Sequence, residues 1–220
     1  IRTDGHRVRL DGGSTVRHFT VTGGTLRISG SADTFKLILS NGRASGSTGV
    51  PGTDGSPGEP GMLGDANPDP SLTNPFSIPE PGTPGQAGTG GAAGTSGGEA
   101  RGGSILVTSG IVELADVSFT GNVAAGGAGG TGGTGGAGGR GGEGGGGGNG
   151  ANANGTAAGA GGTAGMGAVG GDGGDGLGGA IYNAGSVALT RVTIDNSNLA
   201  LGGAGGPGGN GGPGGAGGSG

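Results

Sequence analysis

The sequence GGAGGTGGTGGAGGRGGEGGGGG, residues 126–148, has hardly any side chain that a hydrophobic core could bury. Two glycines separate its successive variable residues, which are Ala128, Thr131, Thr134, Ala137, Arg140 and Glu143. A period of three matches neither the α-helix nor the β-strand, but it matches the extended left-handed helix with three residues per turn. We therefore expect an ordered, polyglycine II-like segment that packs sideways through main-chain hydrogen bonds.

The same period continues beyond short interruptions, so the glycine-rich segments are interpreted as hairpin arms. Residues 149–155, NGANANG, are rich in residues that tolerate turns, and the triplet pattern returns in 156–177. An earlier arm has glycine at every third position before and after a glycine-free tip. The expected arms are 45–101 with the tip 65–81, 126–177, and the start of a further arm in 202–220. Ordering each residue costs ~1–2 kcal/mol, so limbs should pack against limbs of successive repeats or of neighbouring molecules.

Between the arms lie three related segments in which apolar residues alternate in short runs. Residues 102–130 and 178–206 align closely, and 23–46 form a looser third copy. A period of two indicates strands, and repeated strand segments of this length are typical of solenoids. We expect an all-β fold, a right-handed parallel β-helix whose solenoid rungs are 1–44, 102–125 and 178–201. The aligned core positions are Leu26/Val112/Val187, Ile28/Leu114/Leu189, Val117/Val192 and Leu39/Phe119/Ile194.

The alignment also pairs residues on the outer surface of the rungs. Asp116 falls opposite Arg191, which predicts an ion pair between adjacent rungs, and Glu113 falls opposite Arg27 and Ala188. A surface pair of this kind contributes about 0–1 kcal/mol, so it would help the register more than the stability.

The composition excludes several classes of protein. Glycine accounts for 71 of 220 residues, which is typical of repetitive fibrous chains and not of ordinary globular domains. A net charge of −5 disfavours a nucleic-acid partner, and no cysteine is available for a disulfide or a thiolate metal site. No signal peptide or membrane span is apparent. The chain is interpreted as a segment of a longer protein.

The motifs GGAI at 178–181 and FTGN at 119–122 resemble the GGAI and FxxN repeats of the chlamydial-type polymorphic outer membrane proteins. The arms resemble the GGX tracts of the mycobacterial PE-PGRS surface proteins, whose PE head is absent here. The first motif reads GGSI at 102–105, and in the last repeat Asn198 comes one residue later than the second motif requires. Both resemblances imply a secreted or surface β-helical protein.

Candidate chemical sites are few. GGDGGDGLG at 170–178 fits a calcium-binding nonapeptide, with Asp172 and Asp175 as weak metal candidates, but both are also consecutive variable positions of a triplet limb. No cofactor is expected. We predict no enzyme, because no two of the rung acids share one ladder; these are Asp33, Glu113, Asp116 and Asp195. The histidines His6 and His18 are expected at the surface.

The tip of the first arm carries Leu72, Phe76 and Ile78 among prolines. These residues are the candidate interaction site, either for adhesion to a surface ligand or, equally, folded back over an edge of the solenoid. The expected function is a structural repeat protein, extracellular or at the cell surface, whose arms pack laterally into a fibre, sheath or adhesin stalk through self-association. The alternative is a stand-alone adhesin or ice-binding module that uses the arms or their tips as its binding face.

Overall fold

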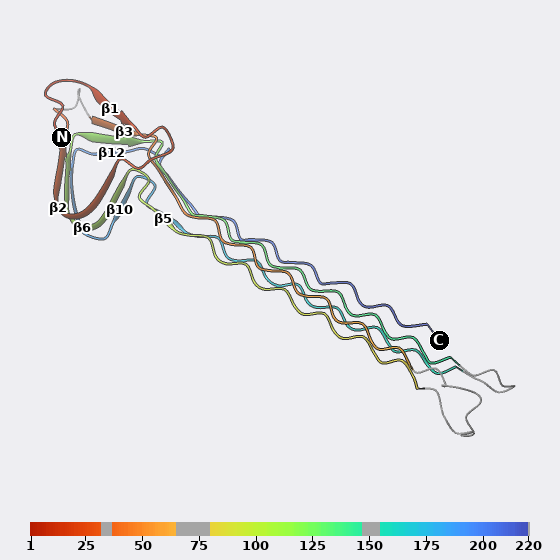
Figure 1. Ribbon diagram of the computed structural model, residues 1–220. Helices are drawn as coiled ribbons and strands as arrows, with labels where there is room; N and C mark the ends of the chain where they lie inside the picture. Colours follow the sequence, from red (N-terminus) through yellow and green to blue (C-terminus); the bar gives the residue numbers. More distant parts are fainter. Residues whose placement is uncertain (32–36, 65–79, 147–154, 220) are drawn as a thin grey trace, which may run out of the picture. The chain divides into compact units, whose positions relative to one another are not determined.

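The structure is a computed structural model and describes residues 1–31, 37–64, 80–146 and 155–219. Over these residues the protein is all-β: its sheets consist of parallel strands, none is closed, and there is no helix, hence none that could cross a membrane (Figure 1). The chain divides into two compact units. The sheet unit comprises Ile1–Val50, Ser96–Gly130 and Asp172–Gly206, and the limb unit comprises Pro51–Thr95, Thr131–Gly171 and Pro207–Gly220.

All the strands belong to the sheet unit and come from three consecutive passes of the chain, which we call rows. The strands of the first row are β1 (Val8–Asp11), β2 (Phe19–Ser29), β3 (Leu37–Ser40) and β4 (Arg43–Ser45). The strands of the second row are β5 (Ala100–Arg101), β6 (Ile105–Ala115), β7 (Val117–Thr120) and β8 (Val123–Ala125). The strands of the third row are β9 (Gly176–Leu177), β10 (Ile181–Asn183), β11 (Ser186–Thr190), β12 (Thr193–Ile194) and β13 (Leu199–Leu201).

The rows pair in parallel, each strand with its counterpart in the next row. β6 lies between β2 and the pair β10 and β11, β7 between β3 and β12, and β8 between β4 and β13; β1 adds to β3, and β5 pairs with β9. The register confirms the predicted alignment of Leu26 with Val112 and Val187, of Ile28 with Leu114 and Leu189, and of Leu39 with Phe119 and Ile194.

The core of the sheet unit is made by alternate residues of these strands. In the second row Leu114 and Phe119 are buried, because the first and third rows cover them on both sides. Their counterparts in the third row, Leu189 and Ile194, are about half exposed (50% and 49%). The alternation that predicted strands thus also fixes which face of each strand enters the core.

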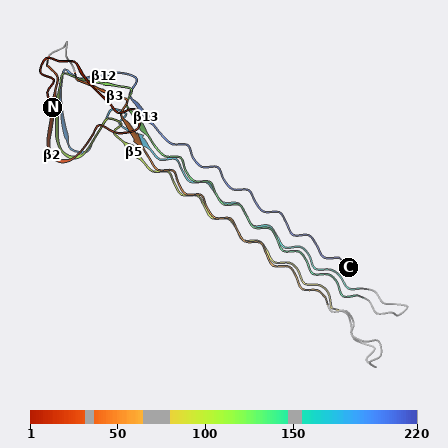
Figure 2. The ribbon, with the colours of Figure 1, turned by 45° about the horizontal axis from the view of Figure 1, so that its top comes forward.

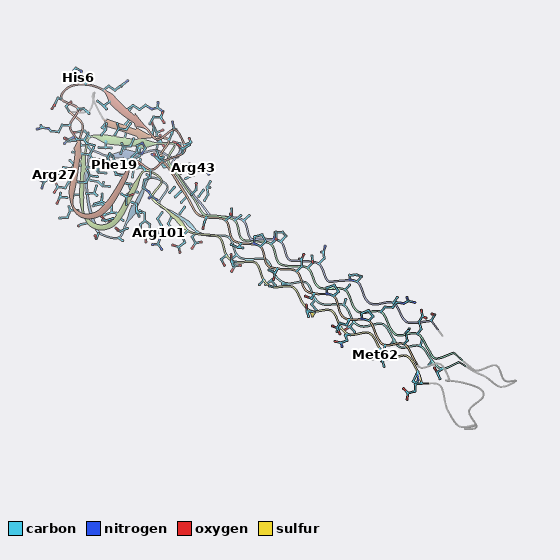
Figure 3. The ribbon with its side chains drawn as sticks, in the orientation of Figure 1. His6, Phe19, Arg27, Arg43, Met62 and Arg101 are labelled. Carbon is cyan, nitrogen blue, oxygen red and sulfur yellow. The ribbon has the colours of Figure 1, made fainter. Side chains whose placement is uncertain are left out.

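Asp116 and Arg191 occupy equivalent corners of the second and third rows, and both have a left-handed backbone, with φ of 53° and 48°. The Arg191 guanidinium donates two hydrogen bonds of 2.7 Å to the Asp116 carboxylate, which confirms the predicted ion pair. The pair is not fully on the surface, however, because Asp116 is buried. A buried carboxylate needs its partners, so this pair matters more to stability than an exposed one. The aligned pair Arg27 and Glu113 also forms an ion pair, at 2.6 Å. Arg27 lies on an exposed face of the sheet unit (Figure 3).

His18 is half-buried, and the expectation that it lies at the surface is wrong. Its Nε2–H donates to the Leu10 carbonyl at 3.0 Å, and the Ser104 hydroxyl lies 3.0 Å from Nδ1. Burial is the main cause that lowers the pKa of His18 below its usual 6.5. The ring is therefore held neutral as a link between the first and second rows.

This environment predicts that the sheet unit loses stability in mild acid. Between the lowered folded pKa of His18 and 6.5, the unfolded chain binds the proton more readily than the folded chain does. The contribution of neutral His18 to stability is therefore complete above pH 6.5 and is lost as the pH falls through the folded pKa. Urea unfolding followed by circular dichroism at several pH values measures this decline, and a His18→Asn variant should show less of it. A His18 pKa at or above 6.5, measured by NMR, would contradict the prediction.

Candidate functional site

The limb unit consists of five extended, glycine-rich segments that lie side by side (Figures 1 and 2). We name them limb 1 (51–64), limb 2 (80–95), limb 3 (131–146), limb 4 (155–171) and limb 5 (207–219). Strand pairing of the usual kind is absent from these described residues, and the main-chain hydrogen bonds instead recur at every third residue. The limb unit is thus held by its backbone, as the triplet pattern predicted.

Limb 3 hydrogen-bonds to limbs 1 and 5, which run parallel to it. The amides of Gly52, Gly55 and Gly58 in limb 1 donate to the carbonyls of every third residue of limb 3, starting at Thr131, at 2.7–2.8 Å. Limb 3 donates in turn to limb 5. These bonds, of 2.8–2.9 Å, join Gly132 to Pro207, Gly135 to Asn210 and Gly138 to Pro213.

Limb 3 also hydrogen-bonds to limbs 2 and 4, which run antiparallel to it. The amide of Gly136 donates to the Thr89 carbonyl in limb 2, and its carbonyl accepts the amide of Gly165 in limb 4, both at 2.8 Å. Gly139 repeats this arrangement one triplet later, between Gln86 and Gly162. In the triplets from 131 to 142, four of the six main-chain polar groups are therefore bonded to main-chain groups of neighbouring limbs.

Two rows of glycine in limb 3 have no room for a side chain. A Cβ on Gly133, Gly136 or Gly139 would lie closer than 3.0 Å to a carbonyl oxygen of limb 1, a distance that real Cβ atoms do not reach. A Cβ on Gly135 or Gly138 would collide in the same way with a carbonyl of limb 4. Glycine is required here by the close approach of two backbones and not by an unusual φ.

The limbs differ in how many glycines each triplet contains. In limbs 1 and 2 one residue in three must be glycine, because a Cβ there would collide with a carbonyl. In limb 1 this row runs from Gly52 to Gly64 and faces limb 2. In limb 2 it runs from Gly82 to Gly91 and faces limb 3. Most of their other positions carry side chains of several kinds, such as threonine, proline, acidic or apolar residues, and are exposed, as Met62 is (Figure 3). In limb 3 every triplet from 131 to 145 has two glycines, whereas in limb 4 only the triplets 160–162 and 169–171 do.

The variable third residues of limb 3 face outward. Thr131, Thr134, Arg140 and Glu143 are exposed, and Arg140 and Glu143 form an ion pair of 3.3 Å along the limb. In limb 4 the equivalent positions, including Met166 and Val169, are likewise exposed. The side chains of the variable residues therefore lie on the surface of the limb unit, and main-chain hydrogen bonds hold the limbs together.

The weak metal candidates Asp172 and Asp175 are both exposed, and their carbonyls accept the amides of Gly97 and Ala100 at 2.8 and 2.7 Å. Nowhere in the described ranges do three or more His, Cys, Asp or Glu side chains gather as a metal site would require. The two aspartates thus occupy the positions that the triplet pattern assigns to them. The interaction candidates Leu72, Phe76 and Ile78 lie outside the described residues.

The described acids of the rows are engaged in local contacts. Glu113 pairs with Arg27 and Asp116 with Arg191, while the Asp195 carboxylate accepts the Ser197 amide. The hydrogen bond and charge of Arg27 lower the pKa of Glu113, and the Ser197 hydroxyl is the main cause that lowers the pKa of Asp195. A carboxylate held ionised in this way is a poor proton donor. Asp33 lies outside the described residues.

Sequence reasoning missed an asparagine ladder that links all three rows. The fully buried Asn122 accepts the Gly42 amide at 2.8 Å, donates to the Leu39 carbonyl at 3.0 Å, and donates to the side chain of Asn198 at 2.8 Å. Asn198 in turn donates to the Phe119 carbonyl at 2.9 Å. The extra residue before Asn198 extends the turn after β12, so Asn198 still lies opposite Asn122.

No protein-family model, curated protein or solved structure matches this chain.

Proposed function

We propose that this protein is a structural repeat protein of the cell surface or extracellular matrix. In this proposal the stacked rows are rungs of a right-handed parallel β-helix, and the limbs are polyglycine II-like arms that pack laterally in a fibre, sheath or adhesin stalk. The observation that supports it is the layer of limbs, which is bonded through backbone amides and carbonyls at every third residue. Such a layer provides length and rigidity without needing a ligand.

The asparagine ladder is compatible with the surface proteins that the sequence resembles. Asn122 is the asparagine of the motif FTGN, and it bonds to Asn198 of the next row. A buried asparagine can hydrogen-bond to the backbone groups of adjacent rungs. In a stacked fold this explains why an asparagine recurs at the same place in each repeat. We therefore propose the same location for this protein, outside the cell.

The location can be tested in the cells that make the protein. Antibodies raised against the limb unit should label intact cells or their matrix, and an external protease should remove the label. Labelling only after permeabilisation would contradict the proposal. A cytoplasmic protein of the same cells, probed in parallel, controls for leakage.

The structural role predicts self-association. In sedimentation velocity the purified chain should form larger species as its concentration rises, without any added ligand. A chain that stays monomeric at every concentration would contradict the structural role.

The exposed side chains of the limbs give the alternative, a binding module, a specific basis. Thr131 and Thr134 stand three residues apart on one exposed line, the spacing that an ice-binding face could use, although the charged pair Arg140 and Glu143 continues that line. This alternative predicts thermal hysteresis in freezing solutions. It also predicts that Thr131→Val and Thr134→Val abolish the activity without altering the fold.

A further inference from the structure

Limbs 3, 4 and 5 each use a row of glycines to lie against the limb two places earlier. A Cβ on Gly136 of limb 3 would lie closer than 3.0 Å to the Ser56 carbonyl oxygen of limb 1. A Cβ on Gly165 of limb 4 would collide in the same way with the Thr89 carbonyl of limb 2, and one on Gly212 of limb 5 with the Gly136 carbonyl. In these three limbs the backbone approaches its predecessor so closely that glycine is required.

Limbs 1 and 2 carry side chains at the positions that correspond to those glycines. Ser56 is the counterpart of Gly136, and Thr89 is the counterpart of Gly165. The other members of the two rows follow at intervals of three residues, and all are exposed. The row of limb 1 is Thr53, Ser56, Glu59 and Met62, and the row of limb 2 is Thr83, Gln86, Thr89 and Ala92. We call these eight residues the first edge. Ala92 corresponds to Ala168, and the others correspond to glycines of limbs 3 and 4.

Two threonines of the first edge replace an acceptor that an earlier limb would otherwise supply. In limb 3 the Gly136 amide donates to the Thr89 carbonyl of limb 2, which comes earlier in the chain. In limb 1 the Ser56 amide donates instead to the Thr89 hydroxyl, at 2.6 Å. The Met62 amide donates to the Thr83 hydroxyl at 2.7 Å. A side-chain oxygen thus satisfies a main-chain donor, as a capping side chain does at the end of a helix.

The path of the described chain explains why no arm precedes limb 1. Arms leave the sheet unit after β4 and after β8, and β1 lies on the outer side of β3 in the same stack. After β1, however, residues 12–18 lead directly into β2. The Val16 carbonyl in this segment accepts the amide of Arg43 in β4 at 2.9 Å. The pass of the chain before limb 1 therefore makes a turn at the place where later passes send out an arm.

We propose that limbs 1 and 2 are a cap, which closes this edge of the limb unit to further limbs of this chain or of a second copy. Main-chain hydrogen bonds alone do not select a partner, because every limb offers amides and carbonyls at the same period. The first edge supplies the missing selectivity. Its side chains occupy the space of a neighbouring limb, and two hydroxyls already hold amides that such a limb would need.

The cap gives the limb unit a direction. Exposed strand edges in sheets are commonly protected against pairing with another chain, and repeat proteins need terminal repeats that differ from the internal ones. Limbs 1 and 2 meet both requirements with polar and bulky side chains in place of glycine. Limbs therefore stack away from the first edge, in the order of the chain. The cap adds to the proposed function a statement of where lateral packing stops.

The double variant Thr83→Val/Thr89→Val tests the capping hydrogen bonds. Valine keeps the bulk of threonine but has no acceptor, so the amides of Ser56 and Met62 should exchange with solvent about fivefold faster or more. The matched control, Thr163→Val, changes an exposed threonine of limb 4 and should leave both rates unchanged. Hydrogen exchange followed by NMR measures these rates. Equal rates in wild type and double variant would overturn the capping role of the hydroxyls.

The triple variant Thr83→Gly/Gln86→Gly/Thr89→Gly tests whether the side chains close the edge. It gives limb 2 the row that limb 4 has, which is Gly159, Gly162, Gly165 and Ala168. The probe is a synthetic peptide of residues 81–95, because limb 2 itself packs in this way beside limb 4. In the triple variant the peptide should slow the exchange of the Ser56 and Met62 amides about tenfold or more. In the wild type it should leave them unchanged.

A control peptide with Gly85→Val and Gly88→Val should not slow these amides in either protein, because its side chains would strike the carbonyls of limb 1. Slow exchange of Gly136 shows that the limb unit is folded. Peptide protection of Ser56 and Met62 in the wild type would overturn the cap, and so would its absence in a folded triple variant. If the triple variant does not fold, the valine variant decides. Self-association, which tests the proposed function, is a separate measurement, so either proposal can fail without the other.

Discussion

Replacing Gly136 by alanine is expected to destabilise the limb unit by about 3–5 kcal/mol. Gly136 is buried in limb 3, and a Cβ there would collide with the Ser56 carbonyl of limb 1. The limb can escape this collision only by moving, which breaks the bonds of Gly136 to Thr89 and Gly165. Each broken bond costs about 1 kcal/mol, and the lower entropy of unfolded alanine returns only about 0.4–1 kcal/mol.

Urea unfolding followed by hydrogen exchange of the limb amides measures this loss. Gly146→Ala is the matched control, because Gly146 is an exposed glycine of the same limb with nothing within 4 Å of an added Cβ. The control should be neutral or slightly stabilising. If both variants unfold alike, the close packing of limb 3 against limb 1 is wrong.

Replacing Asn122 by alanine is expected to cost the sheet unit about 3–4 kcal/mol. The side chain is fully buried and bonds to the backbone of the first row, through Gly42 and Leu39, and to Asn198 of the third row. Alanine would leave the Gly42 amide without this acceptor and create a cavity beside it. Buried polar groups without partners cost about 1–3 kcal/mol each.

The free energy of unfolding of the sheet unit, from urea titration, tests this value. The exposed asparagine of limb 5, Asn210, supplies the control, since Asn210→Ala removes the same side chain from a site where the backbone carbonyl accepts the hydrogen bond from Gly135. That variant should change stability by less than about 0.5 kcal/mol. An Asn122→Ala loss below 1 kcal/mol would mean that the ladder is not a main support of the stacked rows.

Much of the sheet unit could be predicted because its rows repeat in sequence. Aligning 102–130 with 178–206 was enough to give the register of Leu114 with Leu189, and the same alignment gave the pair Asp116–Arg191. In a stacked fold, residues that align between successive repeats lie next to each other in the structure. The sequence showed Asn198 as a departure from the motif, because the turn before it is one residue longer, and this hid its equivalence to Asn122.

The lateral order of the limbs could not be predicted, because no side chain encodes it. Their contacts are made by amides and carbonyls that every residue except proline carries, so the triplet pattern gives the period but not the neighbours. The glycine count does not reveal the neighbours either, because limbs 1 and 5 each bond to two limbs but have one and two glycines per triplet. His18 was misplaced because a lone histidine does not reveal that it lies between Leu10 and Ser104.

The exposed line of limb 3 also limits how the arms can change length during evolution. Adding or deleting one residue would rotate the rest of a threefold segment by about a third of a turn and drive Arg140 and Glu143 into rows where no Cβ fits. Insertions or deletions of three codons, nine nucleotides at a time, keep the variable residues on the exposed line. Lengthening of these arms should therefore occur in steps of three residues. Point substitutions of the exposed variable residues should change the surface chemistry of the limb without changing its packing.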